Sequence, residues 1–137
     1  MFKTAVAGVG RQFEGRVGMG NGANNKTYDL EERTEMFARA VRVFVKRLPA
    51  RPADQEDGRQ LIRSSGSVGA NYLEANEALS KKDFVFRIRI CVKEAKESRY
   101  WLRLIDVSDE METMRQRLEA EAQELLNIFG AILRKSE

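Results

Sequence analysis

Apolar residues recur with a helical period along the chain from about residue 29 onward. In residues 81–107 the spacing alternates between four and three residues without a gap, which is the pattern of a helix with one buried face. The same period predicts three more helices, so that the four are expected at about residues 29–48, 54–79, 81–107 and 109–134. The stripe positions are Phe37, Val41, Phe44 and Leu48; Leu61, Val68, Tyr72, Ala75 and Leu79; Phe84, Ile88, Cys91, Ala95, Ser98, Leu102 and Ile105; and Met114, Leu118, Ala122, Leu125, Phe129 and Ile132.

Short polar segments separate these stretches and carry helix-capping signals. Asp29 is followed by Glu32, and Ser80 by Asp83, with the spacing of a capping box that begins a helix. Pro49 ends the first helix because the residue before a proline is disfavoured in the helical conformation. Connections of only a few residues require consecutive helices to run antiparallel. The pattern therefore predicts an all-α fold, an antiparallel up-down-up-down four-helix bundle in residues 28–137.

Residues 1–27 differ from the rest of the chain in composition. They hold six of the ten glycines, and ordering so glycine-rich a segment costs too much chain entropy for a helix or a strand. We expect a flexible, disordered tail before the bundle. Initiation at Met19 is an alternative to initiation at Met1, and the sequence leaves open whether residues 1–18 are translated.

Composition narrows the classes of function. The chain has 42% hydrophobic and 33% charged residues, one cysteine and no histidine. A single cysteine cannot form an internal disulfide and no apolar run is long enough to span a bilayer, so we expect a cytoplasmic protein without membrane contact. Residues 1–27, with four basic residues and one acidic residue, account for the whole formal net charge of +3. An argument for nucleic-acid binding must therefore rest on clusters of charge within the bundle.

Two segments of the chain carry a specific sequence pattern. They are Leu61–Ala75, with the sequence LIRSSGSVGANYLEA, and Lys93–Leu102, with KEAKESRYWL, and Asp83-Phe84 lies between them. With these motifs the chain resembles, over roughly residues 30–132, the bacterial four-helix-bundle proteins first noticed in intervening sequences of large-subunit ribosomal RNA genes. The resemblance implies a bundle that assembles as a ring-like homopentamer and has no known catalytic activity. A related branch, the accessory protein of diversity-generating retroelements, implies a reverse transcriptase and nucleic acid as partners of a basic surface.

The first of these motifs is rich in small residues. Gly66 and Gly69 lie in the interior of a predicted helix, where each glycine costs about 1 kcal/mol relative to alanine. The interpretation that we favour is the close approach of a second helix, which small side chains permit. The alternative is a cleft for a phosphate group or for a side chain of a partner. The small residues of the segment are Ser64, Ser65, Gly66, Ser67, Gly69 and Ala70.

Acidic residues raise the question of a metal site. Glu74 and Glu77 are three residues apart, and Glu94 and Glu97 repeat that spacing on the next helix. Di-iron sites in four-helix bundles also use Glu-x-x-His pairs, and the chain has no histidine to complete one or to act as a general base. We therefore expect no metal, no cofactor and no catalytic activity. The antiparallel register instead places Arg63 level with Glu97 or Ser98, which predicts a structural ion pair between Arg63 and Glu94 or Glu97.

The predicted third helix has more apolar surface than one core requires. Beside its buried stripe runs a second apolar line, which we interpret as an interface between copies of the chain because aromatic residues are favoured anchors of interfaces. The alternative is a wide buried face with the tryptophan at its edge. The predicted interface residues are Phe86, Ile90, Trp101 and Leu104.

Basic residues follow one face of the same helix, with a tyrosine among them. Cations at helical spacing can neutralise nucleic-acid phosphates, and an exposed tyrosine can stack on a base. The alternative is a solvated face that acidic residues of the fourth helix neutralise. The predicted nucleic-acid-binding residues are Arg89, Lys93, Lys96, Tyr100 and Arg103 on this helix and Arg39, Arg42 and Lys46 on the first.

Together these observations predict a non-enzymatic, homo-oligomeric helical-bundle module, pentameric by the family resemblance. Its basic faces are expected to bind RNA or DNA, or a ribonucleoprotein or reverse-transcriptase partner. The alternative is a structural oligomer that binds only proteins. The two differ in one measurable property, because nucleic-acid binding through phosphates weakens steeply as the salt concentration rises.

Overall fold

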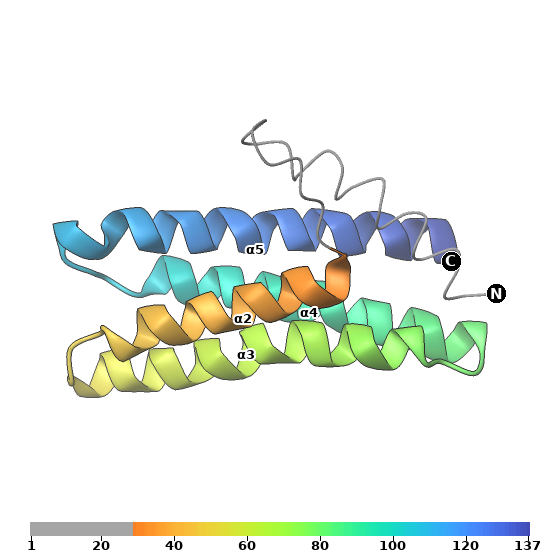
Figure 1. The fold of residues 1–137 in the computed structure, drawn as a ribbon, viewed down its shortest axis with the longest axis horizontal. Helices are drawn as coiled ribbons and strands as arrows, with labels where there is room; N and C mark the ends of the chain where they lie inside the picture. Colours follow the sequence, from red (N-terminus) through yellow and green to blue (C-terminus); the bar gives the residue numbers. More distant parts are fainter. Residues whose placement is uncertain (1–28) are drawn as a thin grey trace.

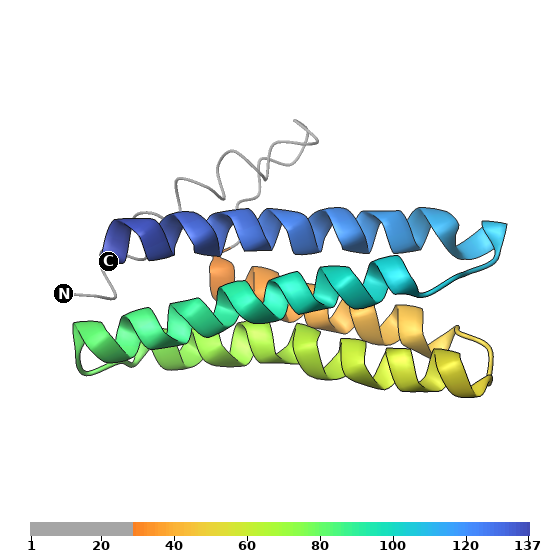
Figure 2. The ribbon, with the colours of Figure 1, turned by 180° about the vertical axis from the view of Figure 1, so that it is seen from behind.

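The computed structural model describes residues 29–137, which form four helices and no strand. The helices are α2 (Leu30–Lys46), α3 (Pro52–Asn76), α4 (Lys81–Leu104) and α5 (Asp109–Ser136). Figure 1 shows consecutive helices running in opposite directions, and Figure 2 shows the same arrangement from behind. α2 packs on α3 and α5, and α4 packs on the same two helices. The predicted all-α four-helix fold is confirmed, while the predicted tail and Met19 lie outside the described residues.

The helices begin where the sequence signals place them. Asp29 caps α2, because its Oδ1 accepts a hydrogen bond from the backbone N–H of Glu32 at 2.7 Å. Ser80 caps α4 in the same way, with its Oγ 3.0 Å from the backbone nitrogen of Asp83. α3 begins at Pro52, since a proline at the first helical position has no N–H to leave unpaired. Side-chain caps therefore set the starts of α2 and α4, and a proline sets that of α3, two residues before the predicted start at residue 54.

The end of α3 corrects one prediction. The helix ends at Asn76 instead of residue 79, and Leu79, a predicted stripe position, is 97% exposed. The reason is the cap of α4, because Ser80 must adopt an extended backbone (φ −145°, ψ 158°) and the chain has to leave the helix before it. α2 also stops earlier than predicted, at Lys46, and α4 stops at Leu104, so the apolar pattern continues past the helix ends.

The core fills the space between all four helices. Every predicted stripe position except Leu48, Leu79 and Met114 is at most 6% exposed. Leu48 lies beyond the end of α2 and is only partly buried, and Met111 takes the buried place at the start of α5 instead of Met114. Within residues 29–137 no helix combines the length and the apolar character that a membrane span requires.

Small residues of α3 allow close contacts on both of its sides. A Cβ atom on Gly69 would lie 2.9 Å from Thr34 Oγ1 of α2, which is closer than side-chain atoms pack. On the other side the Ser64 and Ser98 hydroxyls, both 0% exposed, are 2.9 Å apart and join α3 to α4. This hydrogen bond fixes how α3 and α4 lie along one another and thereby positions the side chains described next.

Candidate self-association and nucleic-acid surface

Arg63 of α3 lies against two carboxylates of α4. Its Nη1 donates to Glu94 Oε2 at 3.2 Å, its Nη2 donates to Glu94 Oε1 at 3.4 Å, and Nη2 also donates to Glu97. The hydrogen bonds to Glu94 chiefly, and then to Glu97, raise the pKa of Arg63 against the effect of its partial burial. The structure thus brings together the three residues of the predicted interhelix pair. The Arg63 side chain is 49% exposed, so the pair lies at the edge of the α3–α4 contact.

Glu97 also orients the only tryptophan of the chain. Trp101 Nε1 donates to Glu97 Oε2 at 3.1 Å, and the indole is partly buried against the core. The Tyr100 ring packs edge-on against the indole, with 5.1 Å between ring centroids and 68° between ring planes. Arg63, Glu97, Trp101 and Tyr100 therefore form one chain of contacts from α3 to the surface of α4.

The predicted interface line is exposed at its two ends and partly buried in its middle. Phe86 is 54% exposed and Leu104 is 48% exposed, whereas Ile90 and Trp101 are partly buried. The alternative of a wide buried face therefore describes only the middle of the line. We use the name outer face of α4 for five exposed side chains of this helix, Phe86, Lys93, Lys96, Tyr100 and Leu104, and treat the exposed, ion-paired Arg89 and Arg103 separately.

The predicted basic line of α4 divides into paired and unpaired cations. Arg89 pairs with Glu137, and Arg103 Nε lies 2.7 Å from Glu119 Oε2. For these two arginines the alternative of neutralisation by α5 holds. Lys93 and Lys96 are exposed and form no ion pair within residues 29–137. The positive charge that is left for a ligand on this line therefore lies at its centre.

The predicted basic line of α2 lies apart from that of α4, since α3 and α5 flank both helices. Arg39 Nε lies 3.0 Å from Glu35 Oε2, and Arg42 Nη1 donates to the backbone oxygen of Ala38 at 3.1 Å. Lys46 is exposed and forms no ion pair with any described residue. The structure therefore does not join the two predicted basic lines into one surface within a protomer.

A groove between α2 and α3 tests the two interpretations of the glycines. A Cβ atom on Gly66 would meet only the Arg42 side chain, at 3.6 Å, so the contact with α2 requires Gly69 but not Gly66. The groove has a volume of about 690 Å³, and four carboxylates at one end make that part unsuitable for a phosphate group. Its charged lining consists of Asp29, Glu31, Glu32, Glu35, Arg39 and Arg42.

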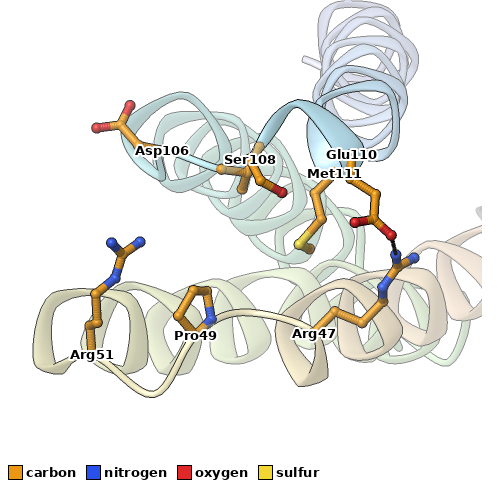
Figure 3. A pocket seen from close by; sticks show the side chains of 8 residues that line it. Arg47, Pro49, Arg51, Asp106, Ser108, Glu110 and Met111 are labelled. Carbon is orange, nitrogen blue, oxygen red and sulfur yellow. Dashed lines mark ion pairs between the residues drawn. The ribbon is translucent and has the colours of Figure 1, made fainter.

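A second depression, of about 740 Å³, lies where the α2–α3 and α4–α5 connections meet. Figure 3 shows Arg47 directed at Glu110 of α5, and these two side chains are 3.8 Å apart. Arg51, on the other side of Pro49, is already paired with Asp54 at 2.6 Å. Because both arginines have acidic partners, the depression favours neither an anion nor a cation.

Arg33 of α2 forms a buried clamp that our sequence reasoning missed. Its side chain is 9% exposed, and its Nη2 lies 2.8 Å from both Glu121 Oε1 and Glu124 Oε2 of α5. Burial lowers the pKa of Arg33, but the hydrogen bonds and charges of the two carboxylates outweigh it and raise the pKa overall. The signal was present, because Arg33 lies three residues after Leu30 and four before Phe37, on the buried stripe.

A second missed network joins the ends of α4 and α5. Arg115 hydrogen-bonds Glu112, Glu119 Oε1 at 3.1 Å and the backbone oxygen of Leu102 at 3.1 Å. The hydrogen bond from Arg103, and then that from Arg115, lowers the pKa of Glu119. The hydrogen bond to Glu112 raises the pKa of Arg115. These contacts hold the α4–α5 end of the bundle together and occupy the carboxylates of Glu112 and Glu119.

The remaining candidates for chemistry are packing groups. Within residues 29–137 no three Cys, Asp or Glu side chains are placed to hold a metal ion. Cys91 is 0% exposed, its Sγ donates to Val68 O at 3.4 Å, and burial raises the pKa of the thiol. Such a thiol is a poor nucleophile because it stays protonated.

Comparison with known proteins identifies the family. A crystal structure of a protein with unknown function from the S23 ribosomal protein family of Bacteroides thetaiotaomicron matches with a TM-score of 0.63 and 27% sequence identity. The match covers 76% of this chain and 94% of that one. A comparison with curated proteins gives no match. The sequence model of the 23S rRNA-intervening sequence protein family matches residues 26–131, and the chain therefore belongs to this family.

Proposed function

We propose that the protein is a non-enzymatic binding module that assembles with copies of itself and binds nucleic acid through α4. The observation that carries this proposal is the composition of the outer face of α4. Exposed apolar side chains, Phe86 at 54% and Leu104 at 48%, lie on it beside Lys93 and Lys96, which have no acidic partner among the described residues. The face thus offers apolar surface for a second copy at its two ends, and between them positive charge for a phosphate backbone.

Self-association is supported by the amount of apolar surface that α4 exposes after the core is filled. Phe86 and Leu104 are separated by 18 residues, which is about 27 Å along a helix, and partly buried Ile90 and Trp101 lie between them. Exposed aromatic and aliphatic side chains beside partly buried ones, with Glu97 among them, are typical of the edge of a protein–protein interface. We propose a closed ring of five copies, the number that the family resemblance implies.

Nucleic-acid binding is supported by the two unpaired lysines. Each ring would repeat Lys93 and Lys96 in every subunit, and the summed field would attract a polyanion more strongly than one protomer can. A nucleic-acid-processing protein, such as a reverse transcriptase, is the protein partner that we propose on the same resemblance. No step of this function requires a metal or a cofactor.

Size-exclusion chromatography with multi-angle light scattering tests the assembly. We expect a mass several times the protomer mass of 15.6 kDa at micromolar concentration, and a monomer for the double variant Phe86→Ser/Leu104→Ser. The matched control is Leu73→Ser/Leu79→Ser, which removes two exposed leucines from α3 and the connection after it and should leave the mass unchanged. A wild-type protein that is monomeric at these concentrations would contradict the self-association.

Fluorescence anisotropy with labelled RNA and DNA across a salt titration tests the second part. We expect binding at low salt that weakens as salt rises, and a smaller salt slope for Lys93→Gln/Lys96→Gln. The control Arg117→Gln/Lys135→Gln removes the same charge from exposed positions of α5. Equal loss in both variants would mean that net charge, and not the outer face of α4, drives binding.

The second candidate function is a structural oligomer that binds only proteins. It is favoured by the pairing of Arg89 with Glu137 and of Arg103 with Glu119, which removes half of the predicted α4 cations from a phosphate-binding role. The two functions separate in the same titration. An oligomer that binds neither RNA nor DNA at low salt would establish the second function.

A further inference from the structure

Tyr100 presents an aromatic ring that the fold supports but does not cover. The side chain is 55% exposed, although its ring is held edge-on by Trp101 at 5.1 Å. Trp101 is itself fixed by its hydrogen bond to Glu97, which Arg63 holds from α3. The ring therefore has a defined place on the surface, and binding a flat ligand there would cost less ordering than binding to a free side chain.

The nearest exposed cations without an ion pair lie on one side of this ring, since Arg99 is partly buried and donates to Gln123 of α5. Lys96 is four residues before Tyr100 and Lys93 is seven residues before it, one and two helical turns away on the same face, or about 6 and 10 Å along the axis. On the other side Arg103 is paired with Glu119. A polyanion that follows α4 would thus place its phosphates over the two lysines and its next flat group over Tyr100.

The chemistry of this arrangement favours single strands over duplexes. In a duplex each base is stacked on its neighbours and shows a protein only its edges in the grooves. To stack on an aromatic side chain, a duplex base would first have to leave its stack, which costs energy. A single strand presents base faces directly, and stacking on an aromatic ring is tolerant of base identity because every base has such a face.

We propose that Tyr100 is the base-stacking platform of a single-stranded nucleic-acid site on α4, with Lys93 and Lys96 on the adjacent phosphates. This proposal rests on the nucleic-acid binding proposed above and adds the strand class and the stacking residue. The site reads no sequence, since neither lysine nor tyrosine offers paired donors and acceptors for a base edge. Binding of single-stranded DNA and RNA of one length should therefore be similar.

The test measures anisotropy of labelled dT20, rU20 and a 20-base-pair DNA duplex with the full chain and three variants. Tyr100→Leu removes the ring but keeps apolar bulk, Tyr100→Phe keeps the ring, and Lys93→Gln/Lys96→Gln removes the charges. We expect Tyr100→Leu to weaken single-strand binding about tenfold with an unchanged salt slope, because stacking releases no counterions. Tyr100→Phe should stay within about twofold of wild type, and the lysine variant should reduce the salt slope by about 1.4.

Trp101 provides a second readout that needs no label. It is the only tryptophan of the chain and touches the Tyr100 ring, so dT20 should change its emission in the wild type and in Tyr100→Phe. Circular dichroism should show equal helix content in all variants because Tyr100 is exposed. Single-strand binding that Tyr100→Leu leaves intact, or a duplex that binds as tightly as dT20, would overturn this inference alone. Absence of binding to all three probes would overturn the proposed nucleic-acid binding as well.

Discussion

Gly66 and Gly69 lie one turn apart on α3, and the structure predicts opposite effects when each is replaced by alanine. A Cβ atom at position 69 would lie 2.9 Å from Thr34 Oγ1 and 3.2 Å from Thr34 Cβ. Thr34 cannot yield, because it is 1% exposed and its hydroxyl donates to Leu30 O at 2.7 Å. At position 66 the only neighbour is the end of the flexible Arg42 side chain, at 3.6 Å.

The magnitudes follow from two opposing contributions. Replacing a helical glycine by alanine stabilises by about 1 kcal/mol when the new methyl group has space. Overpacking a tight contact costs about 1–3 kcal/mol. Gly66→Ala should therefore raise the free energy of unfolding by up to about 1 kcal/mol, and Gly69→Ala should lower it by about 1 kcal/mol as the clash exceeds the helical gain.

Urea denaturation followed by circular dichroism measures both variants. Protein concentration must be equal in all samples because assembly adds to apparent stability, and midpoints are compared only where the slopes agree. The cost of Gly69→Ala should shrink when Thr34→Ala is present, since the two side chains share one contact. If both glycine variants shift the midpoint in the same direction, or if Thr34→Ala rescues nothing, the described approach of α2 and α3 is wrong.

Arg33→Met should lower the free energy of unfolding by about 2 kcal/mol, because it leaves Glu121 and Glu124 without their buried partner. This loss is smaller than that for a fully buried ion pair, since both carboxylates are partly exposed to solvent. Arg59→Met, which removes the exposed ion pair of Arg59 with Glu56, should change the same urea midpoint far less, and equal effects would refute the clamp. The pKa of Glu119 is lowered from 4.5 in the fold, so its stabilising contribution is present above about pH 4.5 and is lost as pH falls through the lowered value. Arg103→Gln should therefore flatten the fall of Tm between neutral and acidic pH, and an unchanged profile would count against this assignment.

The fold could be predicted from the sequence because its signals are local. Ser80 with Asp83, and the unbroken stripe from Phe84 to Ile105, specify where α4 begins and which side is buried. The end of α3 could not be read in this way, since Leu79 keeps the apolar period while nothing in Glu77-Ala78 interrupts a helix. The helix ends earlier, at Asn76, because Ser80 must have an extended backbone to cap α4.

The candidate site shows the same division between local and distant causes. Arg63 could be matched to Glu94 and Glu97 because a short connection fixes the register of α3 and α4. The clamp at Arg33 depends on how the first and last helices of the bundle meet, and no connection in the sequence sets that. Arg33 lies among acidic residues of α2, and its two partners on α5 are far away in the sequence, so only its place on the buried stripe indicates a buried cation.

The hydrogen bonds of Arg33 join residues 88 and 91 positions apart, whereas Arg63 reaches partners only 31 and 34 positions away. Closing the longer loop costs more chain entropy, and contacts of high sequence separation tend to form late. α2 packs less extensively on its neighbours than the other three helices do, so we expect its docking against α5 to complete the bundle last. Amide hydrogens of α2 should accordingly exchange through the most frequent partial opening, in which this helix leaves while the other three remain together.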